Sequence, residues 1–515
     1  MTALAKGRPW LLAAATAIVH ALTAWRYGYF RDELYFIACA KHLAWGYVDQ
    51  PPLVALAAWL AAPAGYQLLA LRAFPVLAAA GTVAVAVLIA RELGGKAFAQ
   101  VLTGVTVGLM PANLALGNIL TTSSFDGVSW TLLAYVAIRL VKRAPQQRTV
   151  PWRLWAGIAV VIAFGLYGKY AMALCALALL GGLLLTPQRR VLATAALPAC
   201  VLLTTLLVLP NVVWQWSHGW PFFEVIAGDA AHRHAFTNGI ALESQDFAAN
   251  TIAYLGEQLL YTNPAAAPVW IAGLIGPLAW PRLRDVRFVS IAYALLVAAA
   301  VALEAKGYYT TGIYATLFAI GSCVVERAPA WLRAATFAVA SAVALATLPI
   351  SLPVLPIDGF IAYSRAIGLA SASVSAPPVM QPLYAEEFGW EGLARDVAAV
   401  YQSMPHRARI AVYADTYADA GAIDFYGAKF GLPPAIGSQN TYWLWGPRDY
   451  DGRKMIAVGA SRIDLLKKYY RSCDLIRTSV EPLKAVVEGP APIYRCSGPR
   501  MPFSSIWPKL RWYGA

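Results

Sequence analysis

The chain has 515 residues, of which 59% are hydrophobic and only 13% are charged, and its mean hydropathy is +0.55. Soluble domains carry roughly 25% charged residues, so this composition excludes a soluble protein. The formal net charge is +14, but the Lys and Arg residues are scattered in short loops between apolar runs. This scatter argues against a nucleic-acid-binding face and indicates membrane topology signals instead.

Apolar runs long enough to cross about 30 Å of hydrocarbon recur from Trp10 to Leu352. They are too long for barrel strands, so we expect helices. When basic clusters are placed on the cytoplasmic side, the pattern predicts about 11 spans, with the N-terminus inside and the C-terminus outside. The spans are predicted at residues 10–25, 66–90, 97–115, 127–141, 191–211, 264–280, 288–304, 312–326 and 331–351, with two more inside 154–185. The first run follows Lys6 and Arg8, as in a signal peptide, but we expect it to be retained as a span.

The run at 154–185 is too long for one span, and Arg153 and Arg189 make both of its flanks basic. We therefore expect two short helices that go out and return, and that meet near Lys169. An ionisable residue at the apex of an interrupted helix pair is typical of sites in transporters and membrane enzymes. The alternative is a lysine that reaches for lipid headgroups.

This topology predicts an all-α polytopic membrane domain over residues 1–352, with large outer loops at 26–65 and 211–263. A small extracytoplasmic α/β domain follows over residues 353–515. Its sequence predicts strands such as Arg409 to Tyr413 and Lys454 to Val458, and a helix near Ser461 to Tyr470, separated by Gly/Pro turns. Of the six cysteines, only Cys473 and Cys496 lie in this domain. A disulfide and two separate thiols are equally compatible with the sequence.

The first outer loop carries two adjacent carboxylates, Asp32 and Glu33, and ends in Asp49-Gln50-Pro51-Pro52. One interpretation is a solvated loop in which the two acids pair with Arg26 and Arg31. The other is acid/base chemistry. Adjacent side chains point in different directions on a helix or a strand, so we expect the two carboxylates to have different roles.

The run from Tyr29 to Leu53 resembles the first loop of C-type (GT-C fold) membrane glycosyltransferases of the bacterial family 39 group. Their relatives include protein O-mannosyltransferases and the aminoarabinose transferases that modify lipid A. The resemblance continues at Asp126, at Gly168-Lys169-Tyr170, at Lys306-Gly307-Tyr308-Tyr309 and in the stretch from Tyr417 to Gly446. It implies a multi-pass protein of the inner cell membrane. The implied reaction is an inverting transfer from a polyprenyl-phosphate sugar to an extracytoplasmic lipid, cell-envelope glycan or protein.

The resemblance also implies roles for individual residues. Asp32 corresponds to the general base, with Glu33 beside it. A phosphate leaving group departs ionised and needs cations and hydrogen-bond donors rather than an acid. The candidates for donor-phosphate binding are Arg31, Lys169, Lys306, Tyr308 and Tyr309. The candidates for the acceptor or the cavity are Asp49, Gln50 and Asp126.

Four of these positions have a simpler interpretation or depart from the family pattern. Tyr308 and Tyr309 are also typical of an aromatic belt at the membrane interface. Asp126 is also typical of a carboxylate at a helix N-terminus. Gln50 stands where the aminoarabinose relatives tend to have a lysine, which removes one phosphate-binding cation and leaves the identity of the donor open.

His232 and His234 flank Arg233, with Asp229 upstream, but three ligands on such a short segment do not make a convincing metal site. We expect no obligatory metal or other cofactor, although a divalent cation is compatible with the fold. The main alternative function is a transporter or flippase of lipid-linked sugars, and the other is a non-catalytic acceptor-binding membrane protein. The position of the acids in an outer loop and the lack of an internal repeat favour the enzyme.

Overall fold

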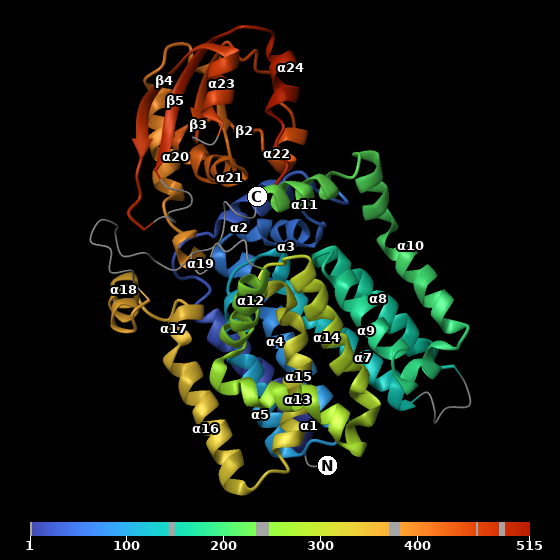
Figure 1. The fold of residues 1–515 in the computed structure, drawn as a ribbon. Helices are drawn as coiled ribbons and strands as arrows, with labels where there is room; N and C mark the ends of the chain where they lie inside the picture. The colour runs from blue at the N-terminus through green and yellow to red at the C-terminus, as the bar shows by residue number, and fades with distance from the viewer. Residues whose placement is uncertain are drawn as a thin grey trace. The chain divides into compact units, whose positions relative to one another are not determined.

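The computed structural model (Figure 1) describes residues 3–143, 150–232, 247–369, 382–459, 462–483 and 490–514. The chain divides into two compact units. We call the first the helical unit; it comprises Met1–Trp25, Leu69–Val213 and Ala241–Val354. We call the second the mixed unit; it comprises Arg26–Leu68, Trp214–Ile240 and Leu355–Ala515.

The helical unit is a bundle of apolar helices, drawn from blue to yellow in Figure 1. Each predicted span overlaps a helix, but the spans at 97–115 and 331–351 are each divided between two helices, with breaks after Gly108 and Ala346. The helices are α1 (Ala3–Ala21), α4 (Leu68–Glu92), α5 (Ala97–Gly108), α6 (Pro111–Leu116), α7 (Asp126–Arg143), α8 (Trp152–Gly168), α9 (Met172–Leu184), α10 (Ala196–Ser217), α12 (Phe247–Thr262), α13 (Ala267–Ala279), α14 (Arg287–Ala302), α15 (Tyr314–Val325), α16 (Ala330–Ala346) and α17 (Leu348–Ser351).

Among the described residues, five helices are long and apolar enough to cross a membrane: Leu68–Glu92, Thr122–Arg143, Ala196–Ser217, Pro281–Ala302 and Gly307–Val325. Six shorter apolar helices accompany them. One of these, Leu53–Ala64, lies in the predicted outer loop at 26–65, where we expected no span. Which side of the membrane each end of the chain faces stays a prediction.

The interruption predicted near Lys169 is present. Helix α8 ends at Gly168, Lys169 has extended backbone angles (φ −157°, ψ 138°), and α9 begins at Met172. Glycine at 165 allows this tight reversal, because a Cβ there would lie 2.5 Å from Cγ of Met172.

The predicted loop at 211–263 differs most from expectation. Helix α10 continues through Pro210 to Ser217, and the loop contains α11 (Pro221–His232) and α12. The continuation is reasonable because residues 211–216 contain no charged side chain and include two tryptophans, which suit the membrane interface.

Small residues bring two central helices together. A Cβ on Gly273 would overlap the backbone oxygen of Leu317, and one on Gly321 would overlap that of Val269. Helices α13 and α15 therefore pack backbone against backbone, as small residues permit in membrane bundles.

The mixed unit combines the first predicted outer loop with the C-terminal residues. The loop forms α2 (Arg31–Ala40) and α3 (Leu53–Ala61). The C-terminal helices are α18 (Ile357–Ala366), α19 (Pro382–Ala385), α20 (Trp390–Gln402), α21 (Tyr417–Tyr426), α22 (Asn440–Leu444), α23 (Ile463–Tyr469) and α24 (Phe503–Ile506). The strands are β1 (Ala411–Ala414), β2 (Ile436–Gly437), β3 (Lys454–Val458), β4 (Tyr470–Ser479) and β5 (Ala491–Pro499), drawn in orange and red in Figure 1.

The strands form one sheet in the order β2-β1-β3-β5-β4, in which β1 is parallel to β2 and β3, and β5 is antiparallel to β3 and β4. Tyr413 and Met455 pack with Phe503 and Trp507 on one face. The alternate residues, such as Ile456, are buried as well. Helices therefore cover both faces, as the α/β prediction requires.

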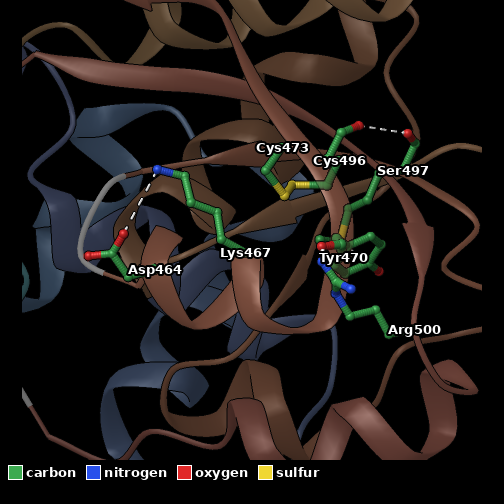
Figure 2. Close-up of a disulfide and its surroundings, with 9 residues drawn as sticks. Asp464, Lys467, Tyr470, Cys473, Cys496, Ser497 and Arg500 are labelled. Carbon is green, nitrogen blue, oxygen red and sulfur yellow. Dashed lines mark hydrogen bonds and ion pairs between the residues drawn. A yellow bond between two sulfur atoms is a disulfide. The ribbon is translucent and has the colours of Figure 1, made fainter.

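The sequence did not decide whether Cys473 and Cys496 are paired. In the structure they form a disulfide, which Figure 2 shows between β4 and β5. Cys473 and Cys496 lie directly opposite each other in the antiparallel register. The other cysteines, Cys39, Cys175, Cys200 and Cys323, are free and buried.

Candidate active site

The acidic pair lies in the first turn of α2, and its two members differ. The backbone N–H of Phe30 donates to Oε2 of Glu33 at 2.9 Å, and Glu33 is fully buried. Such a carboxylate satisfies a free amide at the helix N-terminus. The side chain of Asp32, by contrast, is 26% exposed. The geometry thus gives Glu33 a structural contact and leaves Asp32 accessible.

Asp32 is held by neighbours from both ends of the sequence. The hydroxyl of Tyr417 donates to its Oδ1 at 2.9 Å, and Nε of Arg31 lies 3.6 Å from the same oxygen. Arg31 also pairs with Glu386, at 3.3 Å. A hydroxyl donor and a cation both favour the charged form of a carboxylate. A general base needs that form.

Asp49 forms a second acidic group in the same unit. Tyr35 donates its hydroxyl to Oδ1 at 2.8 Å, and the side-chain amide of Asn440 donates to Oδ2 at 3.1 Å. Burial raises the pKa of Asp49 to about 7, and the negative charge of Asp32 adds to the increase. A carboxyl group with this pKa exchanges its proton near neutral pH.

Gln50 is 2% exposed, and its side-chain amide lies 3.6 Å from the sulfur of Cys39. This burial explains why a neutral residue is accommodated here, because a buried lysine would have to be paired or lose its charge. The predicted contact of Gln50 with an acceptor stays a prediction.

No role was predicted from the sequence for the C-terminal residues that contact Asp32, Arg31 and Asp49. Tyr417 and Asn440 lie inside the stretch from Tyr417 to Gly446, whose resemblance to the glycosyltransferase family was the one sequence signal that pointed to them. No sequence signal pointed to Glu386, because the sequence does not distinguish a solvent-exposed glutamate from one that pairs with Arg31.

The second group of predicted residues lies in the helical unit, around Lys169. Its amine donates to Oγ of Ser123 at 2.6 Å and lies 3.8 Å from the ring centre of Tyr309 and 5.1 Å from that of Tyr308. Asp126 interacts electrostatically with Lys169 and hydrogen-bonds with Ser123. The structure therefore brings four predicted residues together, with Ser123 as an additional member.

Tyr308 and Tyr309 are carried by the 3₁₀ segment η7 (Gly307–Ile313). Gln258 of α12, which is 1% exposed, holds this segment. Its amide donates to the backbone oxygen of Gly307 at 2.9 Å, and its side-chain oxygen accepts from Thr310 at 3.0 Å and from Tyr314 at 3.2 Å. Gln258 was not predicted as a site residue, because it lies in the segment expected to be a loop.

Lys306 precedes η7, and its side chain is exposed. In the part of the chain that the structure describes, no hydrogen bond or ion pair links its amine to the group around Lys169. The role of Lys306 stays a prediction.

Among the described residues, no group of three or more His, Cys, Asp or Glu side chains is suited to hold a metal ion. Arg233 and His234 lie outside the described residues, as do the side chains of Asp229 and His232. The metal requirement therefore stays open.

Residues 49–214 match the model of a family described as dolichyl-phosphate-mannose-protein mannosyltransferase. ArnT from Cupriavidus metallidurans bound to undecaprenyl phosphate aligns with a TM-score of 0.61 at 14% identity, covering 97% of this chain and 100% of that one. Its apo state has the same TM-score and coverage at 13% identity. The chain has the GT-C fold. The oligosaccharyltransferase AglB from Archaeoglobus fulgidus aligns with a TM-score of 0.48 at 13% identity, covering 83% of this chain and 64% of that one.

Among curated proteins, no match to this sequence is found. The ArnT alignment confirms the predicted GT-C fold, a polytopic helical domain followed by a small α/β domain. The apolar helices confirm a multi-pass membrane protein. The family match includes Asp49, Asp126 and Lys169 but begins after Asp32 and ends before Lys306.

Proposed function

We propose that this protein is an inverting glycosyltransferase that moves a sugar from a polyprenyl-phosphate donor to an extracytoplasmic hydroxyl, with Asp32 as general base. The observation that carries this proposal is the accessible carboxylate of Asp32, held by Tyr417 and Arg31. The GT-C fold and the family match of residues 49–214 support the reaction class.

In the proposed step, the acceptor oxygen attacks the anomeric carbon and its proton passes to Asp32. The bond between the anomeric carbon and the phosphate oxygen breaks on the opposite face, and its electron pair leaves on the phosphate. Inversion at the anomeric carbon follows from this geometry. The base supplies proton transfer, which typically contributes about 100-fold to 10,000-fold in rate.

We assign donor-phosphate binding to Lys169, with the hydroxyls of Tyr308 and Tyr309 as neutral donors. A preorganised ammonium is suited to the charge that develops on the leaving phosphate. Because these groups neutralise that charge, the proposed reaction has no obligatory metal. Arg31 lies between two carboxylates, which favours an orienting role over the predicted phosphate contact.

The sugar is proposed to be a hexose or a pentose, and the acceptor a lipid, a cell-envelope glycan or a protein. The interrupted helix pair around Lys169 also suits a flippase of lipid-linked sugars, which is the second candidate.

The test compares the wild type with Asp32→Asn in membranes supplied with radiolabelled polyprenyl-phosphate hexose or pentose, at matched expression. Asp464→Asn serves as a control, since the Asp464 side chain is 92% exposed and pairs only loosely with Lys467 at 3.8 Å (Figure 2). We expect label to leave the polyprenyl fraction for a new acceptor in the wild type and the control, but not in Asp32→Asn. Label that crosses the bilayer unchanged in all three proteins would overturn the enzyme and favour the flippase.

A further inference from the structure

We infer that Tyr417 is a positioning residue for Asp32. The C-terminal α/β part of the chain, by which we mean Leu355–Ala515 of the mixed unit, would then supply a residue that orients the proposed general base. This inference rests on the proposed function. It assigns to the C-terminal part a role in the reaction itself.

The contact joins residues 385 positions apart in the sequence. Tyr417 is the first residue of α21, and its hydroxyl donates to Oδ1 of Asp32 at 2.9 Å. Its ring packs on that of Tyr35, with centroids 4.9 Å apart, and the guanidinium of Arg31 lies 5.9 Å from the ring centre. Its backbone N–H donates to the side chain of Gln439 at 2.8 Å. The phenol is therefore fixed at its ring and at its backbone.

Helix α21 is itself fixed on α2. A Cβ on Gly421 would lie 2.9 Å from the carbonyl carbon of Leu34 and 3.0 Å from the backbone nitrogen of Tyr35. The two helices thus approach at a distance that only glycine permits at this position. Because Asp32 lies at the start of α2 and Tyr417 at the start of α21, this close packing sets the distance between their side chains.

The hydroxyl acts on the orientation and charge of Asp32. It contacts the same oxygen as Arg31, so that these two contacts together hold the plane of the carboxyl group. Burial raises the pKa of Tyr417 well above its usual value, so the hydroxyl remains a donor throughout the neutral range. A donor to the ionised form of a carboxylate favours that form. Without this donor, Asp32 is expected to take up a proton at higher pH.

A purely structural role is the alternative, and the chain offers a matched control for it. Tyr442 is also buried in the mixed unit, and its hydroxyl also donates to a carboxylate, Asp424, at 2.9 Å. Tyr442→Phe therefore removes a comparable hydrogen bond without touching Asp32.

The experiment uses the full-length wild type, Tyr417→Phe and Tyr442→Phe, with melting temperatures measured for each. For Tyr417→Phe we expect the acid limb of the kcat/KM profile to move up by about one pH unit, with the donor KM unchanged. At a pH on that limb, the rate should fall about tenfold. Tyr442→Phe should keep the wild-type profile even if its melting temperature falls.

A second readout does not depend on turnover. Water-soluble carbodiimide reacts with protonated carboxyl groups, and peptide mass spectrometry follows its addition to Asp32. The pH midpoint of this addition should rise by a similar amount in Tyr417→Phe and stay unchanged in Tyr442→Phe. Identical profiles and midpoints for the two variants would overturn the inference while leaving the proposed function intact. A wild type that transfers no sugar would overturn both.

Discussion

The amine of Lys169 lies 3.8 Å from the ring centre of Tyr309, although 140 residues separate the two in sequence. The same amine donates to Ser123 at 2.6 Å. An ammonium over an aromatic face gains roughly 0.5 to 2 kcal/mol, depending on how far it is removed from water. Lys169 is therefore an ordered cation inside the helical unit, which argues against the alternative of a lysine that reaches for lipid headgroups.

Replacing Lys169 by methionine should weaken binding of the sugar donor. The change removes a charge-assisted contact with phosphate, which is worth roughly 1.5 to 3 kcal/mol. We expect the KM for the polyprenyl-phosphate sugar to rise at least about tenfold, as measured by initial rates in detergent or in membranes.

Lys429→Met is the matched control for Lys169→Met. Lys429 also lies over two aromatic rings, at 5.3 Å from Tyr426 and 5.1 Å from Phe430, but on the exposed surface of the mixed unit. Its loss should leave the donor KM unchanged. If Lys169→Met and Lys429→Met have the same KM, Lys169 does not bind the donor. A rise in KM for Lys306→Met alone would assign the phosphate to Lys306.

Alanine at Gly421 should separate α21 from α2. A Cβ there would lie within 3.1 Å of the Leu34 and Tyr35 backbone, which side-chain rotation cannot relieve. We expect lower transfer activity and a lower melting temperature, because Tyr417 then loses its place beside Asp32.

Gly392→Ala in α20 is the control, since a Cβ there meets nothing within 4 Å. Alanine is favoured over glycine in a helix by roughly 0.5 to 1 kcal/mol. The two substitutions should therefore change the melting temperature in opposite directions. An increase for both variants would show that α2 and α21 do not pack closely.

Much of this fold could be predicted from the sequence because lipid imposes a strong pattern. Runs of apolar residues and basic flanks located most helices of the bundle, including the break at Lys169, but not the apolar helix at Leu53–Ala64 or the continuation of α10 to Ser217. Strands β1 and β3 were visible as short apolar runs, but β4 was not. Its residues are largely exposed, so alternation gave no signal.

Only part of the candidate site could be predicted from the sequence. Asp32 stood out because two carboxylates are adjacent in an outer loop, and Lys169 because an ionisable residue inside a long apolar run is rare. Tyr417, Gln258 and Glu386 did not, because their roles depend on contacts across long sequence separations. No local pattern marks a tyrosine whose partner is 385 residues away.

Asp49 should make stability depend on pH between about pH 4 and 7. Its pKa is raised from 3.8 to about 7, chiefly by burial, while the hydrogen bonds from Tyr35 and Asn440 oppose the increase. A carboxyl group with a raised pKa in the folded state contributes stability that is fully present below its unfolded pKa. That stability is lost as the pH rises through about 7.

The measurement is the melting temperature of the purified protein from about pH 4 to 9, for the wild type and Asp49→Asn. Between about pH 4 and 7 the wild type should lose stability relative to the variant, which has no carboxyl group to ionise there, and above about pH 7 the difference should level off. Parallel curves for the two proteins would show that Asp49 keeps an ordinary pKa.

The Cys473–Cys496 disulfide should stabilise the C-terminal α/β part. It closes a loop with a sequence separation of 23 residues, for which the chain-entropy model gives about 3 kcal/mol. The substitution Cys473→Ala should therefore lower the melting temperature by several degrees. A disulfide also persists only in an oxidising compartment, which is consistent with the predicted extracytoplasmic position of this part.

Treatment with a reducing agent distinguishes the effect of losing the disulfide bond from the effect of replacing the cysteine side chain. It should lower the melting temperature of the wild type toward that of Cys473→Ala and leave the variant unchanged, because the described free cysteines, Cys39, Cys175, Cys200 and Cys323, have no disulfide to lose. In membranes prepared with thiols blocked beforehand, a thiol-reactive polymer should label Cys473 and Cys496 only after reduction. If both react without reduction, the chain carries two separate thiols, and the support that the disulfide gives to an extracytoplasmic C-terminal part is lost.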